Sequence, residues 1–171
     1  GSAPQVGSSP TLLVEDFLRA TAAGMYDDFA TARLYLQPEA SATWRPNLQV
    51  AVFSSDFSPS PELKDRQGEL AQVSLSLSTV GTVNESGVLS VSVTPGSVST
   101  EFTLTLNEDG EWRIAELADG VILSQSAFTN AYQNVNLLFP SSDLSGLVPD
   151  PRWYRRSRVA AYLMQGLIEG P

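Results

Sequence analysis

The segment from residue 69 to residue 83, in which apolar and small polar side chains alternate over residues 73–78, is the feature that most constrains how this chain folds. Val73, Leu75 and Leu77 alternate there with serines. A period of two places the apolar side chains on one face of a β-strand and the serines on the other face. The segment therefore predicts a long strand in an antiparallel sheet that has one buried face and one face toward solvent.

Further strand patterns lie on both sides of this segment, and turn sequences separate them. Residues 84–87, residues 94–96 and Asp109-Gly110 have the composition of tight turns, because Gly and Asn tolerate the backbone angles that such turns need. Residues 55–68 are polar and contain two prolines, so we expect a loop there. The sequence predicts an antiparallel meander of four or five strands, over residues 48–54, 69–83, 88–93 and 98–106 and from Trp112 onward.

Helical patterns precede these strands. Residues 11–23 repeat apolar side chains at helical spacing and end at Gly24. A second helix is expected from residue 27 or 28 to Leu36, and a further helical turn over residues 39–43. Helices that group on one face of an antiparallel sheet define an α+β domain, which is the fold class predicted here.

The region after the main sheet predicts a separate strand-turn-helix unit. Residues 121–132 have the pattern of a short extended piece followed by a helical turn, and residues 134–139 have that of a strand. A short returning strand at Leu147-Val148 is expected to end at Pro149-Asp150-Pro151, because proline interrupts sheet pairing. A helix follows over residues 157–169.

The apolar side chains of this unit need a partner. We expect them either to fold back on the main sheet or to pair with a neighbouring molecule, since exposed apolar surface and open strand edges promote association. The side chains concerned are Leu137, Leu138, Phe139, Leu163 and Leu167.

Cysteine and histidine, which supply much of the chemistry of active sites, are absent from the whole chain. Thiol nucleophiles, disulfides and histidine bases are therefore excluded, as are the usual zinc sites. The acidic groups at residues 108–111 and Asp119 lie in turn sequences, where we interpret them as turn formers. The alternatives are a loose calcium site at residues 108–111, which has no EF-hand pattern, and a functional role for Asp119 at the mouth of a pocket. We predict that the chain is not an enzyme and that it uses no metal or cofactor.

Charge is unevenly distributed along the chain, whose formal net charge is −9. Arg152, Arg155, Arg156 and Arg158 lie close together near the C-terminal end, and the rest of the chain is strongly acidic. An acidic protein is poorly suited to nucleic acid, so we expect no nucleic-acid partner. No apolar run has the ~18 residues that a membrane-spanning helix needs.

Aromatic side chains supply two candidate sites. Three large aromatics could line a ligand pocket in the open end of the sheet, or could serve only as core residues. A second group combines aromatic and basic side chains in an exposed patch, which we interpret as an interdomain contact before an external partner site. The candidate pocket residues are Trp44, Trp112 and Tyr132, and the candidate patch residues are Trp153, Tyr154, Arg155 and Arg156.

Several segments in a fixed order carry a family resemblance. They are LVEDFLRA, ARLYL, TWRP, DGEWRIAELADGVILSQSAFTNAY, LLFPSSDLSGLVPDPRWYRR and LMQGLIEGP, and they extend from about residue 10 to residue 171. Together they resemble the N-terminal region of the actinobacterial lipoprotein LpqB family. Residues 1–9, before these segments, have the composition of a flexible linker, so we expect a flexible leader there. The resemblance implies a nuclear-transport-factor-2-like (cystatin-like) cone over residues 10–132. It also implies that residues 133–171 are the start of a truncated GerMN domain.

The same resemblance implies a function. It implies an extracytoplasmic lipoprotein, held on the outer face of the cell membrane only through a lipid anchor upstream of residue 1. The implied partners are the remaining GerMN and β-propeller domains of the parent protein and the extracytoplasmic domain of an MtrB-like sensor histidine kinase. The protein would modulate that kinase in cell-envelope signalling. The alternative function is binding of a small ligand or a cell-wall glycan by the cone.

Overall fold

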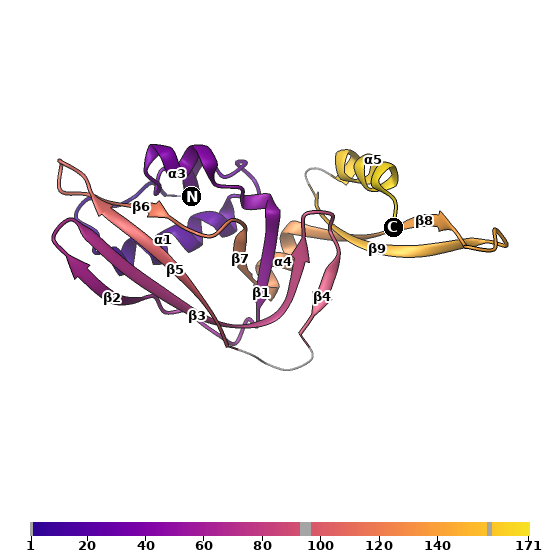
Figure 1. Ribbon diagram of the computed structural model, residues 1–171, viewed down its shortest axis with the longest axis horizontal. Helices are drawn as coiled ribbons and strands as arrows, with labels where there is room; N and C mark the ends of the chain where they lie inside the picture. The colour runs from indigo at the N-terminus through magenta and orange to yellow at the C-terminus, as the bar shows by residue number, and fades with distance from the viewer. Residues whose placement is uncertain (1, 93–96, 157–158) are drawn as a thin grey trace.

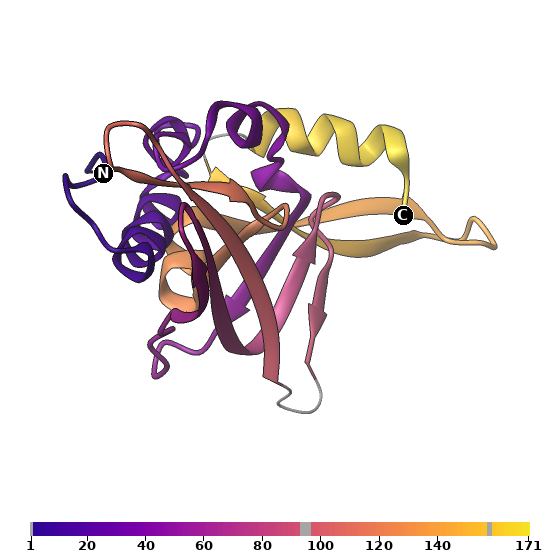
Figure 2. The same ribbon diagram turned by 60° about the vertical axis from the view of Figure 1, so that its left-hand side comes forward.

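The computed structural model describes residues 2–92, 97–156 and 159–171, and it divides into two parts (Figure 1). The body, up to residue 131, packs helices against a strongly curved sheet. The C-terminal unit, from residue 132, is a long two-stranded hairpin that projects from the body and carries one helix on its face (Figures 1 and 2). The predicted turn at residues 94–96 and the predicted helix start at Ser157 lie outside the described residues.

The body begins with the predicted long helix. Helix α1 spans Pro10–Ala23, and the Ser9 hydroxyl caps it by accepting a 3.3 Å hydrogen bond from the Leu12 N–H. Its apolar stripe, which includes Phe17, is buried against the sheet. Two short helices and one 3-10 turn follow, and their bounds are α2 Ala30–Arg33, α3 Pro38–Thr43 and η1 Pro46–Leu48.

The second helix is shorter than predicted because the backbone turns at its start. Asp28 and Phe29 both have positive φ, of 56° and 65°, which is incompatible with a helix and costly for residues with a β-carbon. The buried Phe29 ring packs edge-on against Trp44 at a centroid distance of 5.7 Å. Core packing of this ring therefore holds a conformation that the sequence pattern does not signal.

The predicted long strand is the spine of the main sheet. Strand β3 pairs with β2 and β5 along its first half and with β1 and β4 along its second half, so the sheet bends where its partners change. Val73 and Leu75 are fully buried, as the alternation predicted. The strands of this sheet within the described residues are β1 Gln49–Phe53, β2 Glu62–Gln67, β3 Leu70–Asn84, β4 Leu89–Val91, β5 Ser97–Leu106, β6 Trp112–Glu116 and β7 Val121–Ser124.

Two features of the sheet differ from the expected meander. The expected loop at residues 55–68 contains β2, whose side chains are all exposed, so it shows no apolar alternation. Strand β7 pairs with β1 in parallel, with Val121 opposite Val50. Strands β6 and β7 lie on opposite edges of the sheet order β6-β5-β3-β1-β7, so the chain crosses between the edges before β7 begins. The sheet is therefore mixed, and the fold class is α+β as predicted.

Residues 2–9, the expected flexible leader, make a few contacts with the body although most of them are exposed. The Tyr35 hydroxyl donates a 2.8 Å hydrogen bond to the Ser2 carbonyl. The Gly7 N–H donates to the Glu111 carboxylate at 3.1 Å, and Ser8 is buried. Tyr35 and Glu111, which are far away in the sequence, contact this segment. Its linker-like composition did not indicate these contacts.

The C-terminal unit follows helix α4, Gln125–Ala131. Strand β8 spans Tyr132–Pro140, β9 spans Leu147–Arg155, and helix α5 spans Val159–Glu169. The prediction that Pro149-Asp150-Pro151 ends the returning strand is wrong, because β9 continues through both prolines to Arg155. Proline is tolerated in a strand whose outer edge needs no N–H at that position.

Only part of the apolar surface of this unit is buried. Leu137 is covered by α5, where a β-carbon at Gly166 would lie 2.7 Å from its Cδ1 atom. Leu138 and Leu167 remain exposed, so they do not fold back onto the body, and their pairing with a neighbouring molecule stays a prediction. They belong to β8 and α5, which project away from the body (Figure 1).

Candidate functional site

The three aromatic residues expected to line one ligand pocket lie in separate parts of the core. All three are buried. Trp44 packs against Phe29, whereas the Tyr132 ring stacks on Phe128 at a centroid distance of 4.8 Å. Trp112 lies on β6, near the other end of the body. Burial also raises the pKa of the Tyr132 hydroxyl above its usual value, so this group stays neutral at physiological pH.

A cavity of about 220 Å³ does lie between α1 and the sheet, but other residues line it. Its wall includes the apolar side chains of Phe17, Leu77 and Phe102. Polar side chains of Gln49, Thr79 and Asp119 also line it. Asp119 is held in place because its carboxylate accepts a 2.9 Å hydrogen bond from the Arg45 N–H. The sequence gave no signal for this cavity beyond the turn formed by Asp119 and the glycine that follows it.

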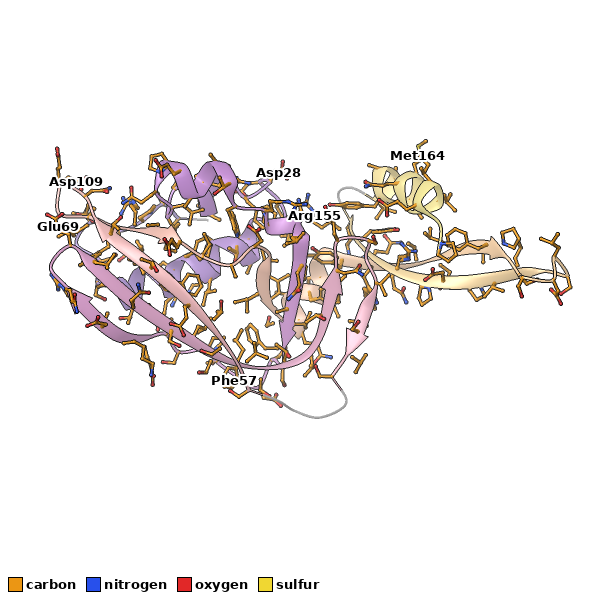
Figure 3. The ribbon with its side chains drawn as sticks, in the orientation of Figure 1. Asp28, Phe57, Glu69, Asp109, Arg155 and Met164 are labelled. Carbon is orange, nitrogen blue, oxygen red and sulfur yellow. The ribbon has the colours of Figure 1, made fainter. Side chains whose placement is uncertain are left out.

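A second, more open groove of about 420 Å³ lies beside this cavity. Leu18 and Ile122 line both spaces, so these two side chains separate the groove from the cavity. Phe53 and Phe57 form one wall of the groove, with an edge-on ring contact at 6.3 Å. Phe57 is partly exposed and lies on the side of the body away from Arg155 (Figure 3). Glu15 and Arg19 from α1 also line the groove, so its wall combines apolar and charged side chains.

The expected exposed patch near the C-terminal end is largely buried. Tyr154 and Arg155 are 3% and 2% exposed, and Trp153 packs against the core of the body with its ring 5.1 Å from Phe128. Only Arg156 is exposed as predicted. The expectation of an exposed patch is wrong for these residues because β9 runs back into the body at its C-terminal end.

These residues join the two parts of the molecule. The Arg155 guanidinium lies 5.6 Å from the centre of the Phe29 ring and donates a 3.4 Å hydrogen bond to Asp28. Figure 3 shows Arg155 and Asp28 on the side of the body from which the hairpin projects. The last residue of the hairpin thus contacts Asp28 and Phe29, two of the three described non-glycine residues that have positive φ.

The turn between β3 and β4 forms the other half of this contact. Arg152 donates to the Ser86 carbonyl at 2.9 Å and to the Gly170 carbonyl at 3.1 Å. The Trp153 N–H donates to the Gly87 carbonyl at 2.8 Å. Hydrogen bonding to Asp150 raises the pKa of Arg152 further, so it remains charged. We call this contact the joint, and it comprises Asp28, Phe29, residues 84–88 and Arg152–Arg155.

The joint requires a glycine at its centre. Gly87 has φ +86°, and a β-carbon there would lie 2.8 Å from the Trp153 carbonyl oxygen. The sequence identified this glycine as part of a turn, but it did not indicate that another strand approaches it. A single sequence reveals turn chemistry without revealing the segment that packs on the turn.

Proteins commonly hold a metal ion with a group of ligand side chains. Residues 2–92, 97–156 and 159–171 contain no group of three or more acidic side chains placed to hold one. Over the same ranges no helix has the length and apolar character to cross a membrane. The described residues thus form an α+β domain with a docked hairpin unit, and the cavity and the groove described above lie in the body.

Comparison with known proteins identifies the family. Residues 3–129 match the family model described as "Lipoprotein LpqB, N-terminal domain". The chain therefore belongs to the LpqB lipoprotein family, as the sequence resemblance indicated. No solved structure matches the chain, so the resemblance to a nuclear-transport-factor-2-like cone comes from the sequence alone.

Curated relatives match nearly the whole chain. The protein named "Lipoprotein LpqB" from Nocardia farcinica (strain IFM 10152) is 32% identical over 98% of this chain and 27% of its own length. Proteins of the same name from Rhodococcus opacus (strain B4) and Thermobifida fusca (strain YX) are 33% and 32% identical, each over 28% of its own length. The chain thus spans less than a third of the length of these relatives.

Proposed function

We propose that this chain is a non-enzymatic protein-interaction module of an extracytoplasmic lipoprotein. Membership of the LpqB family carries the proposal. The lack of histidine and cysteine in the whole chain is consistent with it, because these residues supply the commonest catalytic bases, thiol nucleophiles and metal ligands. Attachment to the outer face of the cell membrane would come from a lipid anchor upstream of residue 1.

The partner we propose is the extracytoplasmic domain of an MtrB-like sensor histidine kinase, whose signalling the lipoprotein would modulate. The remaining domains of the parent protein would be the second partner. Burial of Tyr154 and Arg155 in the joint supports a module of fixed shape, because both parts then present their surfaces in one relative orientation. A fixed orientation lowers the entropic cost of binding a partner that contacts both parts.

A pull-down of the full-length parent lipoprotein with the purified sensor domain tests this proposal. We expect capture of the sensor domain and competition by an excess of the 171-residue chain. The matched control is the sensor domain of an unrelated histidine kinase, which should not be captured. Absence of binding by the intact parent protein, in the presence of a folded sensor domain, would overturn the proposal.

A second candidate function is the binding of a small ligand or a cell-wall glycan fragment in the cavity. The cavity of about 220 Å³, with an apolar wall and polar groups at Gln49, Thr79 and Asp119, favours it. Substitution Ala51→Phe would fill this space, since Ala51 lines the cavity from β1. Titration calorimetry with glycan fragments should then show at least about tenfold weaker binding.

A second alanine-to-phenylalanine substitution, in the neighbouring groove, supplies the control. Ala22 lines the groove but not the cavity, so Ala22→Phe should leave the affinity unchanged. Weakening by Ala22→Phe but not by Ala51→Phe would assign binding to the groove. No binding by the unmodified chain would remove this candidate.

A further inference from the structure

The two edges of the projecting hairpin differ in their hydrogen-bonding groups, and one hydrogen bond reveals the difference. The Trp153 N–H points out of the hairpin, because it donates to the Gly87 carbonyl of the body. In an antiparallel pair, every second residue directs both its N–H and its C=O away from the partner strand. The register between β8 and β9 is continuous, with Asn134 opposite Trp153. Outward and inward positions can therefore be assigned along the whole hairpin.

The outer edge of β9 cannot pair with another strand along its projecting part. Pro151 and Pro149 lie two and four residues before Trp153, so they occupy outward positions. Proline has no N–H, and these positions therefore offer no donor. Closer to the body, the outward N–H of Trp153 is already bonded to Gly87. Along the projecting part this leaves only the outward N–H of Leu147, at the start of β9 beside the hairpin tip. Such edge prolines are a common protection against strand addition.

The outer edge of β8 has no such protection over Asn134, Asn136 and Leu138. The proline of this strand, Pro140, lies at its end, opposite Leu147. The residues opposite the outward positions of β9 are Asn134, Asn136 and Leu138, and they direct their backbone groups outward. Among the described residues, no backbone hydrogen bond reaches these groups. Residues 132–142 contain no charged side chain, and the β8 register has no bulge. Charges and bulges are the devices that usually protect a free edge.

The helix of the unit is also incompletely covered. Met164, Leu167 and Ile168 are exposed on α5, although Gly166 packs closely on the hairpin. Figure 3 shows Met164 on the side of α5 that points away from the hairpin. A helix that is apolar on its outer side as well as its inner side is typical of a buried position. The unit therefore has the surfaces of a partly assembled layer.

We propose that the outer edge of β8 receives an additional strand, supplied by the segment that follows the matched region in the longer LpqB lipoproteins. The matching family model describes an N-terminal domain, and the relatives are more than three times as long as the matched region, so most of their sequence follows it. Helix α5 follows β9 and packs on the hairpin face, as a crossover helix does before the next strand. With β9 blocked, that strand lies beside β8, antiparallel to it and parallel to β9, in a split β-α-β arrangement.

Residue-resolved hydrogen exchange of two proteins tests this proposal: the 171-residue chain and the full-length parent lipoprotein. In the full-length protein the amides of Asn134, Asn136 and Leu138 should exchange at least about tenfold more slowly than in the shorter chain. The inward amides of Val135 and Leu137 are internal controls, since they should be protected in both. Unchanged exchange of the outward amides would overturn the proposal.

A second copy of the chain is the alternative occupant of this edge. Protection of the outward amides in the 171-residue chain that increases with protein concentration, together with a dimer in light scattering, would identify this occupant. That outcome would also overturn the proposal. Neither outcome depends on the kinase partner, so a failure here is distinguishable from a failure of the proposed function.

A pair of substitutions sharpens the test in the full-length protein. Asn136→Pro removes one outward N–H from β8, and it should abolish the added protection of Asn134 and Leu138. The matched control is Pro151→Ala on the opposite strand, which should leave that protection intact. Protection of Val135 and Leu137 verifies that the hairpin itself still forms. Loss of protection in the control but not in Asn136→Pro would place the added strand on β9 and overturn the proposal.

Discussion

The body and the C-terminal unit bury their apolar side chains to very different degrees. In the body, the side chains that alternate along β3 and β5 converge with those of α1 in one continuous core. In the unit, Leu137 and Tyr154 are buried, whereas Leu147 and Ile168 are 63% and 82% exposed. Because apolar burial is the main source of stability, the body has its own source of stability and the unit does not.

The joint explains how the less stable part is still held in place. Its hydrogen bonds from Arg152 and Trp153 reach the β3–β4 turn of the body. The contact of Arg155 with Phe29 adds a cation–π interaction in a buried setting. The unit is thus attached near the body and unsupported toward its tip. The contrast in apolar burial between the body and the unit shows that docking can order a regular hairpin and helix that lack a core of their own.

The largest expected effect comes from truncating the body core. Leu104 is fully buried on β5, so Leu104→Ala should lower the free energy of unfolding by about 3 kcal/mol through lost burial and cavity formation. The same truncation at the exposed Leu147 should change it by less than about 0.5 kcal/mol. Chemical denaturation followed by tryptophan fluorescence measures both. Similar losses for the two variants would contradict the contrast between the parts.

A smaller effect is expected from the joint. Gly87→Ala combines an unfavourable positive φ with a close contact to the Trp153 carbonyl. The free energy that holds the unit on the body should therefore fall by about 2 kcal/mol, and the unit should undock more often. Gly110 has a similar φ of +83° but no neighbour within 4 Å, so Gly110→Ala should cost only about 1 kcal/mol. Hydrogen exchange at the Trp153 amide should rise in the first variant and remain unchanged in the second.

Helix α5 offers a test within the unit. Alanine normally favours a helix over glycine by about 1 kcal/mol, but a β-carbon at Gly166 would overlap the Tyr154 hydroxyl and press on Leu137. We therefore expect Gly166→Ala to loosen α5 without changing the melting of the body. Faster exchange of the α5 amides, with an unchanged main unfolding transition, is the expected result. A more stable α5 would show that the higher helix propensity of alanine outweighs the close contacts at residue 166.

The smallest effect concerns the hairpin tip. Hydrogen bonds from the Ser141 and Ser145 hydroxyls lower the pKa of Asp143 from 3.8 to about 2. A depressed pKa stabilises the folded tip at pH values above the unfolded value, and this contribution is lost as the pH falls from 3.8 to about 2. The Ser145 amide, which donates to Asp143 at 3.1 Å, should shift in NMR spectra over that window. Ser141→Ala should move the midpoint of the shift to higher pH.

The sequence predicted the features whose physical cause is local. Alternation along β3, helical spacing in α1 and the Asp109-Gly110 turn each follow from side-chain periodicity or turn chemistry, and they define the α+β class. Strand β2 was missed because all its side chains are exposed and only its backbone pairing makes it a strand. The prediction that the prolines end β9 was wrong, because the effect of a proline depends on which edge of the strand its nitrogen faces.

The sites were harder to predict than the fold because they depend on contacts between distant segments. Trp44 and Tyr132 are of a residue type that often lines pockets, but packing against Phe29 and Phe128 places them in the core. Arginine is usually exposed, but Arg155 is buried because β9 leads back to the body. Nothing in the local sequence indicates these partners, and a single sequence therefore cannot assign the sites.

Hydrogen exchange across the 171-residue chain tests the difference between its two parts most directly. The account predicts that the Leu75 amide in β3 exchanges only by global unfolding, whereas the inward Val135 and Leu137 amides of β8 exchange by a local opening of distinctly lower free energy. Denaturant should then affect the two groups with different slopes. Equal exchange free energies and equal slopes for β3 and β8 would show one cooperative structure and would contradict the account.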